Sequence, residues 1–206
     1  MSVASSPAIV HIVDDDASFL AATARLLLAS GFAVKTFGGA DAFLAQCGPD
    51  TRGCVIADLQ MPGLDGLAMQ SALARLPNPL PLLFLTGAGD IPSSVRAMRL
   101  GAEDFLEKRA PRDDLLDAVR RALARDLQER EQRSGQQTLQ ARFDALSERE
   151  REVLSHVLRG RLNKQVADDL GINERTVKLH RSAIMSKVGV RSVVELARLA
   201  QDAGLR

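Results

Sequence analysis

Short apolar runs alternate with segments of helical spacing along the first part of the chain, and this alternation restricts the fold more than any other feature. The runs cover Ile9–Val13, Cys54–Ala57, Leu82–Leu85 and Phe105–Leu106, and each is typical of a β-strand. Strands that alternate with helices form a parallel sheet covered on both faces. We therefore expect an α/β domain with a doubly wound parallel sheet.

Polar residues follow each of these runs. Asp14 and Asp15 come after the first run, Asp58 after the second, Thr86 after the third and Lys108 shortly after the fourth. In an open parallel sheet the carboxyl ends of the strands share one edge, and ligands bind at that edge. We expect these residues, which are far apart in the sequence, to lie close together.

The residue types at this edge suit phosphoryl chemistry. Crowded carboxylates repel one another and take up protons unless a cation lies among them, and an oxygen-only cluster suits Mg²⁺. Asp58 is the best candidate nucleophile, because it directly follows an apolar strand and precedes the breaker-rich loop 59–63. A hydroxyl at Thr86 and a positive charge at Lys108 are suited to phosphate oxygens. The sequence predicts an acidic, metal-binding phosphorylation site.

Helix caps mark a second domain near the carboxyl end. Ser147 and Glu150 have the spacing of a capping box, and Gly160 follows the apolar positions of that helix as a stop signal. Ser192 and Glu195 form a second capping box before a final helix. An all-α domain with helices at both ends is expected here.

Between these two helices the sequence predicts a helix-turn-helix. Asn163 can cap a short helix over 164–170, Gly171 permits a sharp turn, and Asn173 can cap a longer helix over 174–188. A short helix, a glycine turn and a longer helix make this motif. With the flanking helices, the domain has four helices.

The longer helix has an apolar face, with Val177, Ile184 and Val188, and a basic face. The residues of the basic face are Arg175, Lys178, Arg181, Ser182 and Lys187. Within a helix-turn-helix such a face indicates a helix that reads the DNA major groove; the alternative is a protein-binding helical bundle.

The two halves of the chain differ in charge. Residues 1–125 hold 12 basic and 14 acidic side chains, whereas residues 144–206 hold 12 basic and 9 acidic ones. This difference agrees with an acidic module joined to a nucleic-acid binder.

The boundary between the domains lies in a stretch rich in Gln, Glu and Arg. Apolar residues keep helical spacing from Arg112, so the last helix of the first domain is expected to run past Arg125 and to break near Gly135. We predict a first domain over 1–125, a helical or flexible linker over 126–143 and a second domain over 144–206. The linker is either solvated or packs in a dimer.

Composition adds a cellular setting. The amino-terminal residues do not resemble a signal peptide, and no run approaches the roughly 20 apolar residues of a membrane span. We expect a soluble cytoplasmic protein with no membrane partner. Cys47 and Cys54 are expected to be half-buried thiols without a redox role.

Both halves of the chain resemble known families. Residues 9–125 resemble the receiver domain of bacterial two-component response regulators, residues 144–200 resemble the LuxR/NarL-type helix-turn-helix domain, and together they resemble a FixJ-type regulator. The first resemblance is carried by the segments His11–Asp16, Asp58–Gly63 and Thr86–Pro92. It implies a five-stranded sheet of the flavodoxin or CheY type followed by the four-helix domain.

The receiver resemblance implies roles for single residues. Asp58 is expected to accept phosphate from a sensor histidine kinase, and Asp14, Asp15, Asp58 and the carbonyl of Gln60 are expected to bind Mg²⁺. Thr86 is then expected to turn toward the phosphate.

Phe105 is the implied coupled aromatic switch, and Lys108 the implied ion-pair partner of the phosphate. The sequence departs from the family after Lys108, where Arg109 and Ala110 precede Pro111 in place of the usual Lys-Pro. A cis bond before Arg109 costs about 2.5 to 4 kcal/mol. We therefore predict a trans bond there and a loop that differs from the family's.

The LuxR-type resemblance implies a DNA contact surface. The residues expected to face base edges are Lys178, Leu179 and Ser182, and those expected to grip phosphates are Lys164, Thr176, His180 and Arg181. Double-stranded DNA, a second copy of the chain on activation and RNA polymerase are the implied partners. The chain is thus expected to be a phosphorylation-switched transcription factor and not an enzyme.

Two alternatives remain open from the sequence. Asp14–Asp16 contains the Asp-x-Asp spacing of aspartyl-phosphate phosphatases, although that class favours Thr or Val where Ser18 stands. The missing proline after Lys108 makes a second alternative conceivable, a DNA-binding regulator whose receiver half is a degenerate, phosphate-independent dimer module.

Overall fold

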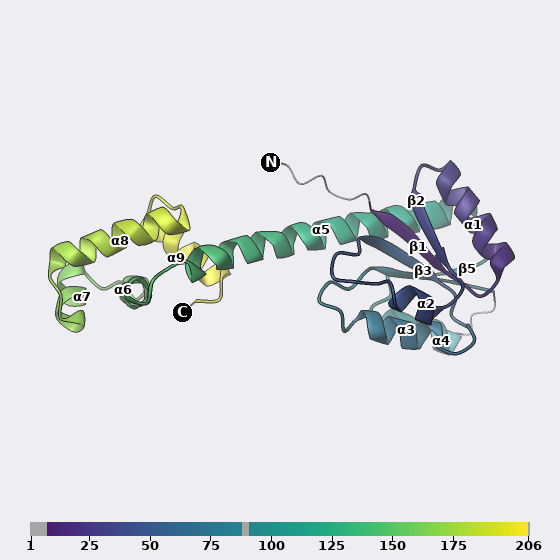
Figure 1. Cartoon of the computed structure of the whole chain (residues 1–206), viewed down its shortest axis with the longest axis horizontal. Helices are drawn as coiled ribbons and strands as arrows, with labels where there is room; N and C mark the ends of the chain where they lie inside the picture. The colour runs from purple at the N-terminus through teal and green to yellow at the C-terminus, as the bar shows by residue number, and fades with distance from the viewer. Residues whose placement is uncertain (1–7, 88–90, 206) are drawn as a thin grey trace. The chain divides into compact units, whose positions relative to one another are not determined.

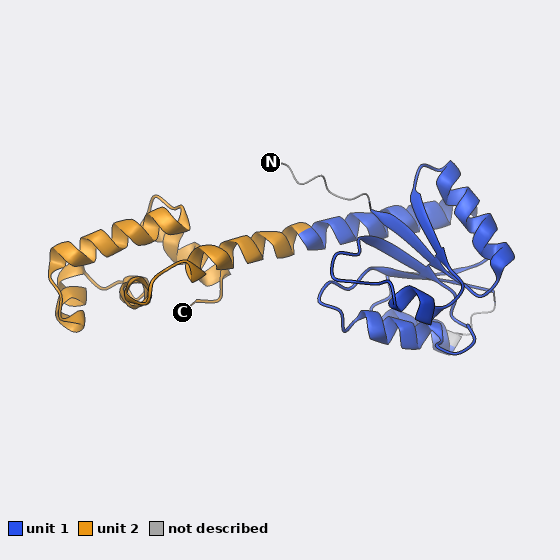
Figure 2. Ribbon diagram, viewed as in Figure 1, with its two compact units in different colours: residues 1–130 blue, residues 131–206 orange. Residues whose placement is uncertain are grey.

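The computed structural model describes residues 8–87 and 91–205 and divides into two compact units, 1–130 and 131–206 (Figure 2). The part of the Thr86–Pro92 segment over 88–90 lies outside the described residues. The strands are β1 Ile9–Val13, β2 Ala33–Phe37, β3 Gly53–Ala57, β4 Leu82–Thr86 and β5 Asp104–Glu107. The helices are α1 Ala17–Ala29, α2 Ala40–Leu44, α3 Gly66–Leu73, α4 Ile91–Arg99, α5 Arg112–Asp144, α6 Glu148–Leu158, α7 Asn163–Leu170, α8 Glu174–Val188 and α9 Val193–Asp202.

The first unit is the predicted parallel sheet, with five strands in the order β2-β1-β3-β4-β5 (Figure 1). Each face has its own core. Alternate residues of β3 show why: Val55 and Ala57 pack in the core that also holds side chains of α2, α3 and α4, whereas Cys54 and Ile56 pack with side chains of α1 and α5. Period-two alternation thus places helices on both faces and leaves the strand ends free to form a site.

Strand β2 was not among the apolar runs from which the strands were predicted. It is an edge strand that pairs with β1 alone, from Ile9↔Ala33 to Val13↔Phe37. Only Phe37 of its five residues is buried. Because an edge strand has one neighbour and here one largely solvated face, it needs no continuous apolar sequence.

The second unit contains the predicted helix-turn-helix, formed by α7, Gly171 in the left-handed conformation (φ 64°) and α8. The capping box of Ser147 and Glu150 at α6 is confirmed, and so is the Asn173 cap, whose side chain accepts the Thr176 N–H at 2.9 Å.

Two caps differ from the prediction. Asn163 is not the cap of α7 but its first residue; the backbone N–H of Leu162, which holds the cap position, donates to Gln165 Oε1 at 3.0 Å. At α9 the Ser192 hydroxyl accepts the Glu195 N–H as expected, but the Glu195 carboxylate accepts the N–H of Arg191 and not that of Ser192. At the start of both helices, backbone N–H groups thus have side-chain acceptors, but the residues involved differ by one position from those that the spacing indicated.

Helix α5 passes through Gly135 without the predicted break. One glycine costs a helix only about 1 kcal/mol relative to alanine, and the neighbouring Gln, Glu and Arg residues are good helix formers. Near residue 125 the helix is held to the sheet. Buried Asp126 accepts the Gly53 N–H at 2.9 Å, and Arg130 donates to Asp126 at 2.8 Å and to the carbonyl of Thr51. The contacts of the first unit therefore continue to Arg130, past the predicted end at 125.

Within the described residues, no helix is long and apolar enough to cross a membrane. The two cysteines are free. Cys47 is half-buried as expected, whereas Cys54 is fully buried within the sheet, and this burial raises its pKa to about 12. A thiol held protonated in this way has little nucleophilic character.

Candidate metal centre and nucleic-acid interface

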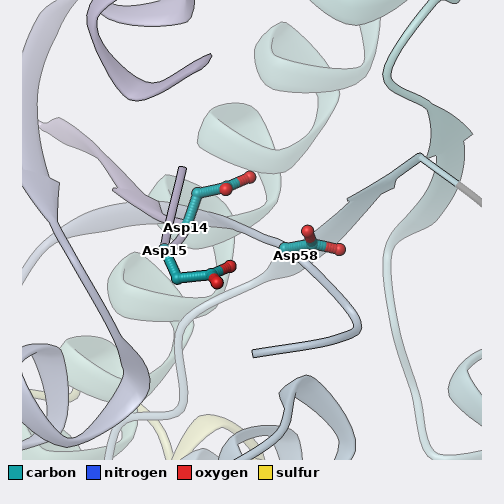
Figure 3. Close-up of side chains that lie close together, drawn as sticks. All are labelled: Asp14, Asp15 and Asp58. Atoms are coloured by element: carbon teal, nitrogen blue, oxygen red, sulfur yellow. The ribbon is translucent and has the colours of Figure 1, made fainter. Parts of the chain in front are cut away.

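Three carboxylates meet at the carboxyl edge of the sheet (Figure 3). Asp14 and Asp15 follow β1, and Asp58 follows β3. The two strands are neighbours with Val13 opposite Ala57, and the Asp58 N–H donates to the Val13 carbonyl at 2.9 Å. One oxygen of each carboxylate lies within 4.8 Å of the others. The predicted convergence of these residues is therefore present.

The backbone around each carboxylate holds it in place. Asp14 Oδ1 accepts the Asp16 N–H at 2.9 Å, while Asp16 itself caps α1 by accepting the N–H of Ser18 at 2.8 Å. Asp58 Oδ1 accepts the Gln60 N–H at 3.3 Å, which ties the start of the following loop to the acid. Asp14 and Asp58 are both buried, and Asp15 is exposed.

Gly66, the first residue of α3, supports the Asp58 loop, and the sequence patterns did not single it out. A Cβ at this position would lie 2.5 Å from the backbone oxygen of Asp58 and 2.7 Å from the ring of Phe84. Only glycine lets the start of α3 approach the loop so closely. A conventional signal for this role is absent, since the glycine adopts no unusual φ.

Lys108 bridges the two buried acids. Its Nζ lies 2.6 Å from Asp14 Oδ2 and 2.8 Å from Asp58 Oδ2, and it lies over the ring of Phe19 at 4.4 Å from the centroid. The peptide bond before Arg109 is trans, as predicted. The backbone N–H of Lys108 donates to the Thr86 carbonyl at 2.8 Å, and with Arg109 in place of the usual proline the Lys108 ammonium still reaches both carboxylates.

The charges of the site depend on one another. Burial raises the pKa of Asp14, an effect that outweighs the lowering by the bonds from Lys108 and the Asp16 N–H. Burial alone lowers the pKa of Lys108, but hydrogen bonds and attraction from Asp14 and Asp58 outweigh it, so that this pKa is raised. The ionised carboxylates of this site are therefore more stable with a cation beside them than without one. Its oxygen-only donors fit Mg²⁺.

The other predicted residues of this edge are in the same region of the fold. Thr86 ends β4 and is 1% exposed. Phe105 is half-buried in β5, with its ring centroid 6.1 Å from that of Phe84. The Gln60 side chain is exposed, while its backbone lies beside Asp58. The switching roles of Thr86 and Phe105 and the metal contact of Gln60 remain predictions.

Helix α8 carries the predicted basic face. Val177, Ile184 and Val188 are fully buried, so the apolar face is confirmed. Leu179 is 65% exposed, so its side chain is accessible on the surface of α8. Lys164, Lys178 and Ser182 are exposed, and Thr176, His180 and Arg181 are partly exposed.

Some side chains of α8 that the sequence placed on its contact surface or basic face have partners within the protein, among them Lys178, whose Nζ lies 3.5 Å from Glu174 Oε1. The Thr176 hydroxyl donates to Asn173 Oδ1 at 3.2 Å. Lys187, placed on the basic face from the sequence, donates to Glu150 Oε2 at 2.7 Å and to the Ala145 carbonyl at 3.3 Å. Lys187 is therefore a structural contact of α8, which spacing along the helix could not reveal.

Comparison with known proteins agrees with both halves. Residues 10–120 match the response regulator receiver domain, and residues 144–200 match the bacterial regulatory proteins of the luxR family. The chain is 43% identical to nodulation protein W of Bradyrhizobium diazoefficiens, over 98% of this chain and 89% of that protein. It is 41% identical to the transcriptional regulatory protein FixJ of Azorhizobium caulinodans, over 95% of this chain and 93% of that protein.

Solved structures give the same result. The low-resolution structure of the response regulator StyR has 41% identity and a TM-score of 0.89, covering 96% of this chain and all of that one. Receiver domains bind Mg²⁺ at acidic pockets such as the one formed by Asp14, Asp15 and Asp58. The chain belongs to the response regulator family and joins a receiver domain to a LuxR-type DNA-binding domain, as the homologous FixJ transcription regulators do.

Proposed function

We propose that Asp58 accepts a phosphoryl group from a sensor histidine kinase and that this modification makes the chain dimerise on DNA and regulate transcription. The observation that carries the proposal is the Lys108 bridge, with its Nζ 2.6 Å from Asp14 Oδ2 and 2.8 Å from Asp58 Oδ2. One buried acid thus has a carboxylate partner and a cation beside it, the set that in-line phosphoryl transfer requires.

Magnesium would be held by Asp14, Asp15, Asp58 and the Gln60 carbonyl, and when bound it neutralises charge on the carboxylates and on phosphoryl oxygens. The chain's own residues do the rest. An Asp58 oxygen forms the new O–P bond while the P–N bond to the kinase histidine breaks, and the imidazole keeps the electron pair. Lys108 then has a new anionic partner in the phosphoryl oxygens.

The switch proposed from the resemblance uses Thr86 and Phe105. Thr86 lies at the end of β4, next to the strand that leads to Lys108, so its hydroxyl can turn toward a phosphoryl group on Asp58. Phe105 lies on the neighbouring strand β5, is half-buried and packs against Phe84, and we propose that its ring moves together with Thr86. About 3 to 5 kcal/mol of differential interaction converts a rare state into the dominant one, and two charge-assisted bonds are of that order.

For the second unit we propose that α8 reads the major groove. Lys178, Leu179 and Ser182 would face base edges, and Lys164, Thr176, His180 and Arg181 would grip phosphates. Two copies would occupy paired half-sites, and RNA polymerase would be the further partner in the cytoplasm. Leu179 is exposed, which leaves its side chain available for an apolar contact with a thymine methyl group.

The experiment that tests the switch is light-scattering mass in Mg²⁺ with and without beryllofluoride, which mimics a phosphoryl group on an aspartate. We expect the wild-type chain to shift from monomer to dimer and Asp58→Asn to stay unchanged. A wild-type chain that does not respond, or an Asp58→Asn chain that responds equally, contradicts the proposal. In that case the phosphate-independent regulator is the better description.

A further inference from the structure

The part of α5 from Glu131 to Asp144 belongs to the DNA-binding unit, although the luxR family match begins only at residue 144. Phe143 is 3% exposed in the core of this unit, and Leu139 packs against that core. Arg142 projects from the same part of α5, and its Nη1 donates to the Val188 carbonyl at 3.2 Å. The linker segment thus supplies part of the structure around α8.

The Arg142 bond is one of a reciprocal pair at the end of α8. Arg142 donates to the carbonyl of Val188, the last residue of α8, and Lys187 of α8 donates at 3.3 Å to the carbonyl of Ala145, which follows α5. The last carbonyls of a helix have no partner within it, and the helix dipole favours cations at this end. Arg142 satisfies both requirements at one point.

We propose that Arg142 is a positioning residue for DNA reading, which holds the carboxyl end of α8 so that its other side chains meet the bases in register. The inference rests on the proposed role of α8 as the reading helix. Lys178 and Val188 are ten residues apart, or roughly 15 Å along the helix. A tilt of a few degrees about one end therefore moves the other by on the order of 1 Å, enough to lose a base-edge hydrogen bond.

The test uses the full-length chain with Mg²⁺ and beryllofluoride and a fluorescent DNA duplex selected from a random pool with the wild-type protein. Arg142→Gln should weaken binding about tenfold, the weight of one charged hydrogen bond. Arg142→Lys, which keeps the cation at the helix end, should recover part of the affinity. The matched control is Arg198→Gln, because Arg198 is exposed on α9 with no hydrogen bond or ion pair among the described residues; it should bind within twofold of wild type.

The dependence of affinity on salt separates positioning from direct contact. Arg142→Gln should keep the wild-type slope of log Kd against log salt, since no phosphate contact is lost. A slope reduced by about 0.9 would mean that Arg142 grips a phosphate, and it would overturn the inference.

Unchanged affinity of Arg142→Gln, or a loss that matches a fall in the thermal midpoint of the unit, would also overturn it. Lys178→Ala is measured in parallel as a check on the proposed reader. If Lys178→Ala binds like wild type, the role of α8 is wrong; if only Arg142→Gln does, α8 still reads DNA and the positioning role is wrong.

Discussion

The receiver site and the reading helix carry their charges in opposite settings. At the receiver edge, Asp14 is 1% and Asp58 is 9% exposed, and Lys108 lies within 3 Å of both. On α8, the Lys178 side chain is 64% exposed and its ion-pair partner Glu174 is 3.5 Å away. A buried charge destabilises the fold when it loses its partner, because it cannot be solvated by water. An exposed charge contributes little to stability, because water and salt screen its interactions.

The largest expected effect comes from removing the lysine at the receiver edge. Lys108→Met keeps the length of the side chain but leaves Asp14 and Asp58 facing each other without a cation. Breaking a buried pair in this way costs about 3 kcal/mol. We expect that loss in the free energy of unfolding of the receiver unit at neutral pH without Mg²⁺, measured by calorimetry.

Lys178→Met is the counterpart on the other surface. Its ion pair with Glu174 is exposed, so the loss should stay below about 0.5 kcal/mol. Adding Mg²⁺ should restore much of the stability of Lys108→Met and none of that of Lys178→Met. Equal losses from both variants would show that the two settings do not differ in the way described here.

The next effect tests whether close packing holds Asp58. Gly66→Ala would place a Cβ 2.5 Å from the Asp58 carbonyl oxygen, so the loop must shift, and we expect a loss of about 2 kcal/mol together with weaker beryllofluoride binding. Gly48→Ala is the matched control, because nothing lies within 4 Å of the added carbon. A Gly66→Ala chain as stable and as responsive as Gly48→Ala would contradict the role assigned to Gly66.

The order of apolar runs predicted the sheet and the meeting of the acids, because the parallel topology alone brings strand ends to one edge. Strand β2 escaped that pattern, since an edge strand with a solvated face needs no apolar run. The sequence predicted that Lys108 lies near the acids, but it could not predict that the ammonium contacts Asp14 and Asp58 at the same time.

The residues that sequence reasoning missed share one property, which is that their role lies in a contact with distant backbone. Gly66 approaches the Asp58 oxygen, Asp126 accepts the Gly53 N–H, and Arg142 reaches the Val188 carbonyl. Neither periodicity nor capping spacing carries information about such contacts. The same reason explains Lys187, which has the spacing of a DNA contact but an intramolecular partner.

Two buried acids should respond to pH in opposite directions, one in each unit. The pKa of Asp14 is raised, chiefly by burial, so its contribution to stability is present below the unfolded pKa of about 3.9 and is lost as pH rises through the folded pKa. The pKa of Glu150 is lowered, chiefly by Lys187, so its contribution is present above about 4.3 and is lost as pH falls.

Metal-free Asp14→Asn should therefore gain stability at pH 7 relative to wild type, and Glu150→Gln should lose it. Calorimetric midpoints of the two units between pH 3 and pH 7 measure both differences, which should shrink toward the acid end. A loss of stability for Asp14→Asn at pH 7 would show that the bond to Lys108 outweighs the burial of Asp14.

The smallest effect on stability should accompany a clear effect on DNA binding. Lys164→Ala removes an exposed cation, so the free energy of unfolding should change by less than about 0.5 kcal/mol. If Lys164 grips a phosphate, DNA affinity falls at low salt, and the slope of log Kd against log salt decreases by about 0.9. The comparison with Lys108→Met is then complete, because one lysine affects folding and the other only binding. A Lys164→Ala chain with the wild-type slope would remove Lys164 from the contact surface and leave the proposed phosphate contacts to Thr176, His180 and Arg181 of α8.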